Sequence, residues 1–431
     1  MPGVTGLQPL NYHLDVAGRL ARLEPEGWRA FATAGERAEL GGLHAELART
    51  AYRLDPQSHP RVGAAMAAAV AALGVEVPVT VHQLEGERQA NAALLHHRQE
   101  VVVTLSGDLL ERLTDPELAA LFGHELAHHR LWTLDGGRFG TADRMLNALA
   151  ADARTPEPFL ETARRWSLAT ELFADRGALA ACGDLQVTVA CLVKVATGLR
   201  EVDAAGYLRQ ADVADPAAGS RGWTHPETVL RAWALQHWDT NRTDEQAATL
   251  LRPRIRPGRP DHDRPDHDRP DHDLPDPGFP DLECLDLADQ EVLEQLTRRM
   301  VGAFLELGGS SSDLVLAHAR AFFPDLQASA TPPSEPVPTA GASAAAAAVQ
   351  VPDATRRYLG YVLLDLATVD PDLQEHGLTA AGELAGRLGF GELFTDLVRL
   401  ELGDAPRSGR GGARTGAARS IGSTPGGRRR R

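Results

Sequence analysis

Two histidines and a glutamate form an H-E-x-x-H motif at His124, Glu125 and His128. On a helix, residues four apart share a face, so both imidazoles can converge on one metal ion. Glu125 then lies beside them, where a carboxylate can deprotonate a water molecule held by the metal. The spacing predicts a zinc-hydrolase site, provided that a third ligand comes from elsewhere in the chain.

The motif needs a helix, and the residues before it supply a start signal. Thr114 can cap the helix, Pro116 suits its first turn, and Glu117 completes a capping box. Two mostly apolar runs upstream, at residues 91–95 and 100–105, predict a pair of strands joined by a short turn. Such a strand can hold an extended peptide through main-chain hydrogen bonds, which place little demand on its sequence.

An earlier segment, residues 75–82, alternates apolar and polar residues like a strand. Pro78 lies inside this run and has no N–H to donate to a neighbouring strand. The sequence therefore predicts an edge or bulged strand here. Residues 14–54 show apolar positions at helical spacing and predict two or three helices that pack on the core that follows.

A long helical pattern over residues 157–182 contains a candidate for the missing ligand. Glu171 and Asp175 are four apart and share a face, where two like charges are unfavourable unless something binds them. One carboxylate can bind a metal ion while the other orients an imidazole N–H. The alternative is a solvated acidic face paired with nearby arginines, of which the candidates are Arg164, Arg165 and Arg176.

Seven short segments together resemble the HtpX and CAAX-prenyl-protease-like family of gluzincin zinc metallopeptidases, as a soluble member. In chain order they are His59-Pro60-Arg61-Val62, Asn91-Ala92, the 101–105 strand with Ser106-Gly107, Asp115-Pro116-Glu117-Leu118, His124 to His128, Glu171 to Asp175, and Thr224-His225-Pro226 with Arg231. The resemblance covers roughly residues 55–238, and its specificity comes from the order and spacing of the segments.

The resemblance implies that His124, His128 and Glu171 bind one zinc ion and that Glu125 is the general base. It also implies that Asp175 steadies a ligand histidine. Characterised members of this kind often carry membrane helices or a secretion signal, and neither is visible in this sequence. Membrane-protein quality control and prenyl-peptide cleavage therefore do not carry over.

His225, just before a helix that starts with Pro226, has two possible roles beside such a site. It can donate to the oxyanion of a tetrahedral intermediate, or it can occupy the position of the water and keep the enzyme latent. A third account is an ordinary surface histidine. Arg231, on the helix that follows, can anchor a site carboxylate. His96, His97 and His129 are interpreted as ordinary surface or core histidines.

Composition limits the class of protein. The chain has 431 residues, a formal net charge of −15 and three cysteines without C-x-x-C spacing. The negative charge argues against a specific nucleic-acid partner. The scattered cysteines fit a reduced compartment, so we expect a cytoplasmic location. The expected substrate is a polypeptide, extended or unfolded, and no transmembrane segment is expected.

The C-terminal half reads as separate units. Arg-Pro-Asp-His-Asp occurs three times from Arg259, and eight arginines without an acidic residue follow Ala405. Both stretches are predicted to be disordered. Residues 354–403 predict a compact helical unit with a weak resemblance to TerB-like domains, which is a possible site for a protein partner. The predicted division is 1–54 (helices), 55–250 (peptidase domain), 251–281 (linker), 282–327 (helical), 328–353 (Ala/Pro/Ser-rich linker), 354–403 (helical domain) and 404–431 (tail).

The expected fold is α+β and mostly helical: a zincin-type core with a small edge-strand sheet and the H-E-x-x-H helix, plus separate helical C-terminal units. The expected function is a zinc metalloendopeptidase in which Glu125 activates zinc-bound water. The alternative is a catalytically silent zinc-binding scaffold or interaction protein, with a latent site closed by His225.

Overall fold

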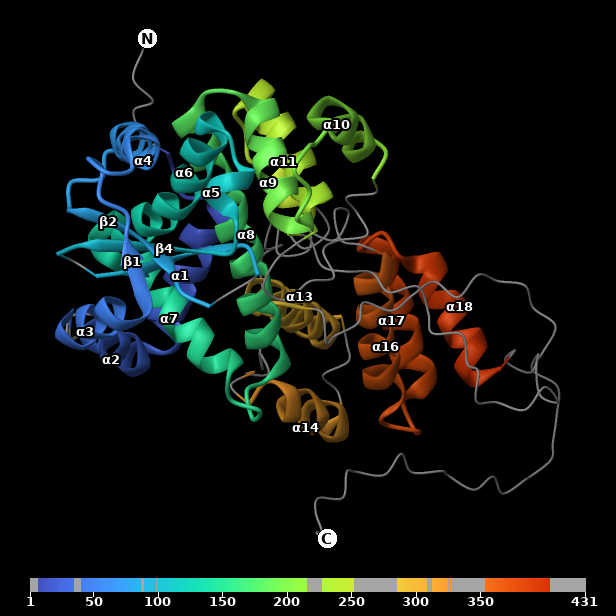
Figure 1. The fold of residues 1–431 in the computed structure, drawn as a ribbon. Coiled ribbons are helices and arrows are strands. Elements are labelled where there is room, and N and C mark those ends of the chain that lie inside the picture. Colours follow the sequence, from blue (N-terminus) through green and yellow to red (C-terminus); the bar gives the residue numbers. More distant parts are fainter. Residues whose placement is uncertain are drawn as a thin grey trace, which may run out of the picture. The chain divides into compact units, whose positions relative to one another are not determined.

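The structure is a computed structural model of the whole chain (Figure 1). It describes residues 7–34, 40–86, 89–97, 99–214, 227–251, 285–307, 312–324, 326 and 353–403. Several features singled out in the sequence lie outside these residues: His225, the Asp-His-Asp repeats, the Ala- and Pro-rich segment up to residue 352, and the arginine-rich tail.

The chain divides into two compact units, and residues 1–298 with 352–355 form the first. Its described part is mostly helical, with one small sheet that carries both parallel and antiparallel pairs (Figure 1). The helices are α1 Asn11–Leu23, α2 Pro25–Ala34, α3 Leu40–Thr50, α4 Pro60–Leu73, α5 Leu109–Arg112, α6 Asp115–Thr133, α7 Arg138–Ala150, α8 Glu157–Cys182, α9 Leu185–Thr197, α10 Ala204–Asp212, α11 Thr228–Asn241 and α12 Glu245–Leu250, followed by the start of α13, Leu287–Glu306.

The sheet has the order β1-β2-β4-β3, with strands β1 Ala51–Arg53, β2 Val79–Leu84, β3 Asn91–His96 and β4 Val101–Ser106. β2 and β4 are parallel, and the other two pairs are antiparallel. The prediction of an edge or bulged strand at residues 75–82 is wrong in two respects. The strand begins only after Pro78, and it lies inside the sheet because the unexpected β1 pairs with its other side.

Helices α6 and α8 cross at unusually small residues, which lets their backbones approach closely. A Cβ on Gly123 of α6 would lie 2.5 Å from the Cβ of Ala181, and one on Gly177 of α8 would lie 2.4 Å from the Cβ of Ala127. Small residues four apart on each helix thus form ridges that fit together. The crossing brings the two predicted ligand-bearing segments side by side.

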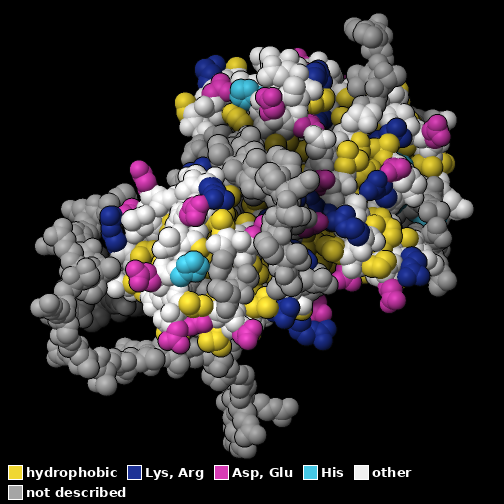
Figure 2. Space-filling model, turned by 180° about the vertical axis from the view of Figure 1, so that it is seen from behind, with side chains coloured by type: hydrophobic (Ala, Val, Ile, Leu, Met, Phe, Trp, Pro, Cys, Tyr) yellow, Lys and Arg dark blue, Asp and Glu magenta, His cyan; other side chains and the backbone are white. Residues whose placement is uncertain are grey.

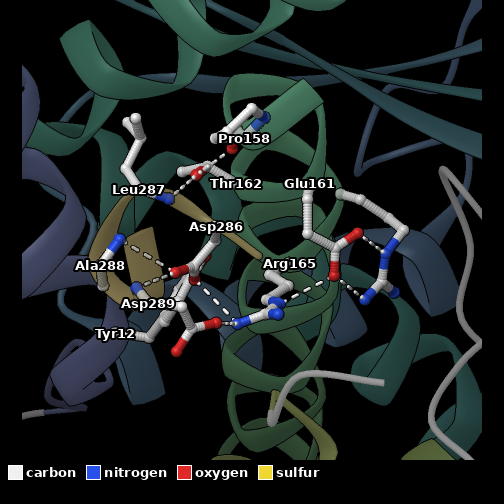
Figure 3. Close-up of polar contacts among 10 residues, drawn as sticks. Tyr12, Pro158, Glu161, Thr162, Arg165, Asp286, Leu287, Ala288 and Asp289 are labelled. Carbon is white, nitrogen blue, oxygen red and sulfur yellow. Dashed lines mark hydrogen bonds and ion pairs between the residues drawn. The ribbon is translucent and has the colours of Figure 1, made fainter. Parts of the chain in front are cut away.

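A buried polar network joins α8 to the segment that precedes α13 (Figure 3). Arg165, 2% exposed, donates to Glu161 at 2.8 Å, to Asp286 at 3.0 Å and to Asp289 at 2.7 Å. The Tyr12 hydroxyl of α1 donates to the second partner, Asp286, at 2.8 Å. Each buried charge is therefore paired, which is the condition under which such groups are tolerated in a core. The network fixes the N-terminal half of α8.

The second unit comprises residues 299–351 and 356–431. Its described helices are the end of α13, α14 Asp313–Phe322, α16 Asp353–Thr368, α17 Gln374–Arg387 and α18 Gly391–Leu402. Their apolar faces form one core, in which Phe304, Leu363 and Ala381 are fully buried. The likeness to TerB-like domains stays a prediction.

Acidic and basic side chains are interspersed on the molecular face seen in Figure 2, with hydrophobic side chains between them. Within the part of the chain that the structure describes, no helix is long and apolar enough to span a membrane.

Candidate metal centre

Three side chains from α6 and α8 converge. His124 and His128 lie one turn apart on α6, and Glu171 faces them from α8; one ligand atom of each lies within 4.8 Å of the others. The two Nε2 atoms are 3.3 Å apart. The carboxylate of Glu171 lies 3.5 Å from His124 Nε2 and 3.8 Å from His128 Nε2. Two ring nitrogens and a carboxylate oxygen therefore point at one small volume.

The start of α6 is held by the carboxylate of Glu117. It accepts the Thr114 backbone N–H at 2.8 Å, as the predicted capping box requires, and it also accepts Lys194 Nζ of α9 at 2.8 Å. Lys194 is the only lysine in the chain, and it is 6% exposed. This pair ties α9 to the beginning of the H-E-x-x-H helix. A lone lysine in an apolar helix was a usable sequence signal for a buried partner.

Asp175 orients the first of these histidines. Its Oδ1 lies 3.1 Å from His124 Nδ1, so a proton on Nδ1 leaves Nε2 free to bind a cation. Arg231 of α11 donates through Nε to Asp175 Oδ2 at 2.8 Å, and its Nη1 forms an ion pair with Glu171 at 3.0 Å. Burial alone would raise the pKa of Asp175, but Arg231 and His124 outweigh it and hold that pKa well below its usual range.

The alternative account of Glu171 and Asp175 as a solvated acidic face does not fit their surroundings. Both carboxylates are buried, at 8% and 1% exposed, and their cationic partner is Arg231. All three arginines considered for that account have other partners: Arg165 bonds Glu161 and Arg176 bonds Asp244, both at 2.8 Å. Arg164 also pairs with Glu161, at 2.7 Å.

Glu125 lies beside the cluster and is only 8% exposed. Burial raises its pKa to about 7, an effect that His124 partly opposes. A cation bound at the cluster would lower this pKa again, because it favours the carboxylate. Burial also lowers the pKa of His128 to about 4, so its imidazole is neutral near pH 7 and has a lone pair for a metal ion.

The donor set fits zinc. Two imidazoles and one carboxylate, with a second carboxylate orienting one of the imidazoles, match the ligand types that catalytic zinc sites use. In the described parts of the chain, these three residues are the one group of histidines, cysteines and acids that lies close enough together to hold an ion.

A pocket of about 610 Å³ contains the cluster and Glu125. One wall is the beginning of β3, which is the edge strand of the sheet, and another is α9 with Cys191, Leu192 and Val195. Alternate β3 side chains are exposed and half-buried, as expected for a strand with one covered face. An extended peptide therefore has both a strand edge and a cavity beside the cluster.

The three other histidines singled out in the sequence have contacts of their own. His129 is buried, with its Nδ1 2.8 Å from Nδ1 of the β3 residue His96. His97 accepts the backbone N–H of Gln99 at 3.1 Å. These contacts fit the interpretation of all three as ordinary histidines. Arg231, by contrast, lies in direct contact with the cluster, and His225 lies outside the described residues.

The site has the parts of a candidate metallopeptidase centre: a small mixed sheet, the H-E-x-x-H helix α6, and the helix α8 that brings Glu171 to it. Sequence comparisons point the same way: residues 56–132, which include His124, Glu125 and His128, match the model of peptidase family M48. The match ends before Glu171, so it does not test the predicted third ligand, which the structure places beside the two histidines.

The chain is also similar to the plastoglobule-localized metallopeptidase 48, chloroplastic, of Arabidopsis thaliana. The two are 31% identical over 207 residues, which cover 42% of this chain and 56% of the relative. The chain thus spans about half the length of this curated relative. Both comparisons are thus similarities to M48 metallopeptidases. No solved structure matches the chain.

Proposed function

We propose that the protein is a zinc-dependent metalloendopeptidase that cleaves extended or unfolded polypeptides. The observation that carries this proposal is the convergence of His124, His128 and Glu171 within 4.8 Å, beside Glu125 and a strand edge in one pocket. The M48 match over residues 56–132 supports the same activity.

In this proposal His124, His128 and Glu171 hold one zinc ion. When bound, the ion supplies Lewis-acid polarisation of the scissile carbonyl and acidifies water. Glu125 takes the proton from the attacking water and passes it to the leaving amine. Asp175 holds the ring of His124 by its Nδ1–H, and Arg231 balances the charges of Asp175 and Glu171.

The substrate would lie along β3. Among the described residues this strand pairs with β4 alone, and its first residues line the pocket together with Gln89 and Ala90. Main-chain hydrogen bonds to such an edge accept many sequences, which suits an unfolded polypeptide. We propose the finer resemblance to HtpX and CAAX-prenyl proteases only for the metal ligands and the general base, and not for the substrates of those proteases. A cytoplasmic location and a partner for the α16–α18 helices also stay predictions.

Zinc reconstitution tests the proposal. The metal-free full chain should not cut casein, and addition of one equivalent of zinc should produce internal cleavages that mass spectrometry locates; 1,10-phenanthroline should abolish them. Zinc binding without cleavage would instead favour the alternative, a silent zinc scaffold. The His225→Ala variant separates the two roles of this residue, because cleavage that begins only in that variant means that His225 closes a latent site.

A further inference from the structure

The pocket beside the cluster extends to a second group of side chains that the proposed chemistry does not use. Asp143 of α7, Trp132 of α6 and Trp166 of α8 all line it, together with Asn147 and Ser167. Trp132 connects the two groups, because its ring centroid lies 5.7 Å from that of His128. The second group is thus one aromatic ring away from the metal cluster.

Asp143 is a carboxylate whose close hydrogen-bond donors are neutral side chains. Its Oδ1 accepts the indole N–H of Trp166 at 3.0 Å, and its Oδ2 accepts the side-chain amide of Asn147 at 3.0 Å. Both donors are neutral. Among the described residues no arginine, lysine or histidine forms an ion pair with Asp143. The neighbouring Arg144 donates to the Phe31 carbonyl, and its charge lowers the pKa of Asp143 without a direct contact. Burial raises the pKa of Asp143, as expected for a desolvated carboxyl of this kind.

The two indoles around this carboxylate are themselves firmly placed. Trp166 is 2% exposed and packs edge-on against His13, with ring centroids 4.8 Å apart. The Nε1 of Trp132 is buried and makes no hydrogen bond of normal geometry, but it lies close enough to Asp143 to lower the pKa of that carboxyl. Indole faces attract cations, and a carboxylate with neutral partners attracts them more strongly.

We propose that Asp143, Trp132 and Trp166 form a specificity subsite for a positively charged group of the substrate, either a Lys or Arg side chain or the α-ammonium of a peptide. This inference rests on the proposed peptidase function. A second metal ion is a poorer occupant, since no other histidine, cysteine or acid of the described residues joins Asp143 in a ligand cluster. A purely structural role, as acceptor for Trp166, would need an oxygen but no charge.

Matched peptides test the subsite with the zinc-loaded full chain. One sequence is prepared with Lys, Arg, citrulline, norleucine or Gln at each position around the scissile bond. We expect kcat/KM to be about 10- to 100-fold higher for Lys or Arg than for the neutral residue at one position, the range that a charge-assisted hydrogen bond provides. Equal rates for charged and neutral peptides at every position would overturn the inference without any variant being needed.

The Asp143→Asn variant keeps the acceptor oxygen for Trp166 and removes the charge, so the ratio of charged to neutral rates should fall to about one. Asp152→Asn, which removes an exposed negative charge just after α7, should leave the ratio as in the wild type. A preference that survives in Asp143→Asn contradicts the assignment. Acetylation of the peptide N-terminus distinguishes the two sources, because it abolishes a preference for the α-ammonium and spares one for an internal side chain.

Binding to the Glu125→Gln protein separates this inference from the proposed function. Calorimetry with the same peptides should show tighter binding of the charged member, and the difference should vanish in the Glu125→Gln/Asp143→Asn protein. Charge-dependent binding with no cleavage by the wild type would contradict the peptidase and retain the subsite. Cleavage without a charge preference would retain the peptidase and contradict the subsite. The absence of both cleavage and charge-dependent binding would contradict both proposals.

Discussion

The carboxylate of Asp175 contacts both His124 and Arg231. One buried side chain therefore holds a candidate metal ligand and the arginine whose charge balances the carboxylates of the cluster. Replacement of such partners commonly costs 10- to 100-fold in metal affinity. We expect Asp175→Asn to weaken zinc binding by about this factor, measured by competition with a chromogenic chelator.

Asp244→Asn is the matched control for this prediction. Asp244 also pairs with a buried arginine of α8, Arg176, but it makes no contact with the cluster. Its variant should bind zinc as the wild type does. An Asp175→Asn protein with unchanged zinc affinity would show that Asp175 does not orient His124.

At the residue scale, spacing alone predicted much of the cluster. Residues four apart on helices must share a face, which is why His124 and His128, and Glu171 and Asp175, could be paired from the sequence. Asp143 and Trp132 gave no comparable signal. They come from different helices, and no periodic pattern connects them, so only the packing of α6, α7 and α8 reveals that they line the same pocket.

At the scale of elements, the site depends on the close crossing of α6 and α8. A methyl group on Gly177 would meet the Ala127 side chain at 2.4 Å and the Gly123 carbonyl at 2.9 Å, and a backbone carbonyl cannot move aside cheaply. Gly177→Ala should therefore push the helices apart, lower the free energy of unfolding by about 1–3 kcal/mol and weaken zinc binding.

Gly302→Ala in α13 is the control, because a Cβ there would meet no atom within 4 Å. It should leave zinc affinity unchanged and should not destabilise the fold, since alanine favours helix over glycine. Denaturant titration and chelator competition measure both quantities. If Gly177→Ala and Gly302→Ala have the same stability and the same zinc affinity, the close crossing is not what positions the cluster.

Helix α8 was predicted over residues 157–182 and forms Glu157–Cys182, because a long apolar period ending at Gly183 marks both its face and its end. The three-residue strand β1 was missed. It continues directly from α3, and it exists only because β2 pairs with it some 30 residues later, a long-range contact that local patterns do not encode. Pro78 led to the wrong prediction of an edge strand for a related reason. It lies just before β2, where it needs no N–H, and its carbonyl accepts the Val101 N–H of β4 at 2.9 Å.

At the scale of the whole molecule, the chain divides into two compact units with separate cores, and the metal cluster belongs to the first. We expect two transitions in calorimetry. Zinc should raise the midpoint of one transition only, because it binds one folded unit; at a free concentration 100 times Kd the gain is about 2.7 kcal/mol.

Ala381→Asp supplies the complementary change. Ala381 is fully buried in the core of the second unit, so an aspartate there should lower the other transition alone. A single transition that responds both to zinc and to this substitution would contradict the description of two separately stabilised units.

The central claim is that Glu125 performs proton transfer in a zinc-dependent peptidase, and the Glu125→Gln variant tests it most directly. Glutamine keeps the shape of the side chain but cannot take a proton from water, and Glu125 is not one of the three candidate metal ligands His124, His128 and Glu171. With unfolded casein as substrate, we predict one zinc per chain in both proteins and a loss of cleavage by about 10²- to 10⁴-fold in the variant. Undiminished cleavage by a zinc-loaded Glu125→Gln protein would contradict the account.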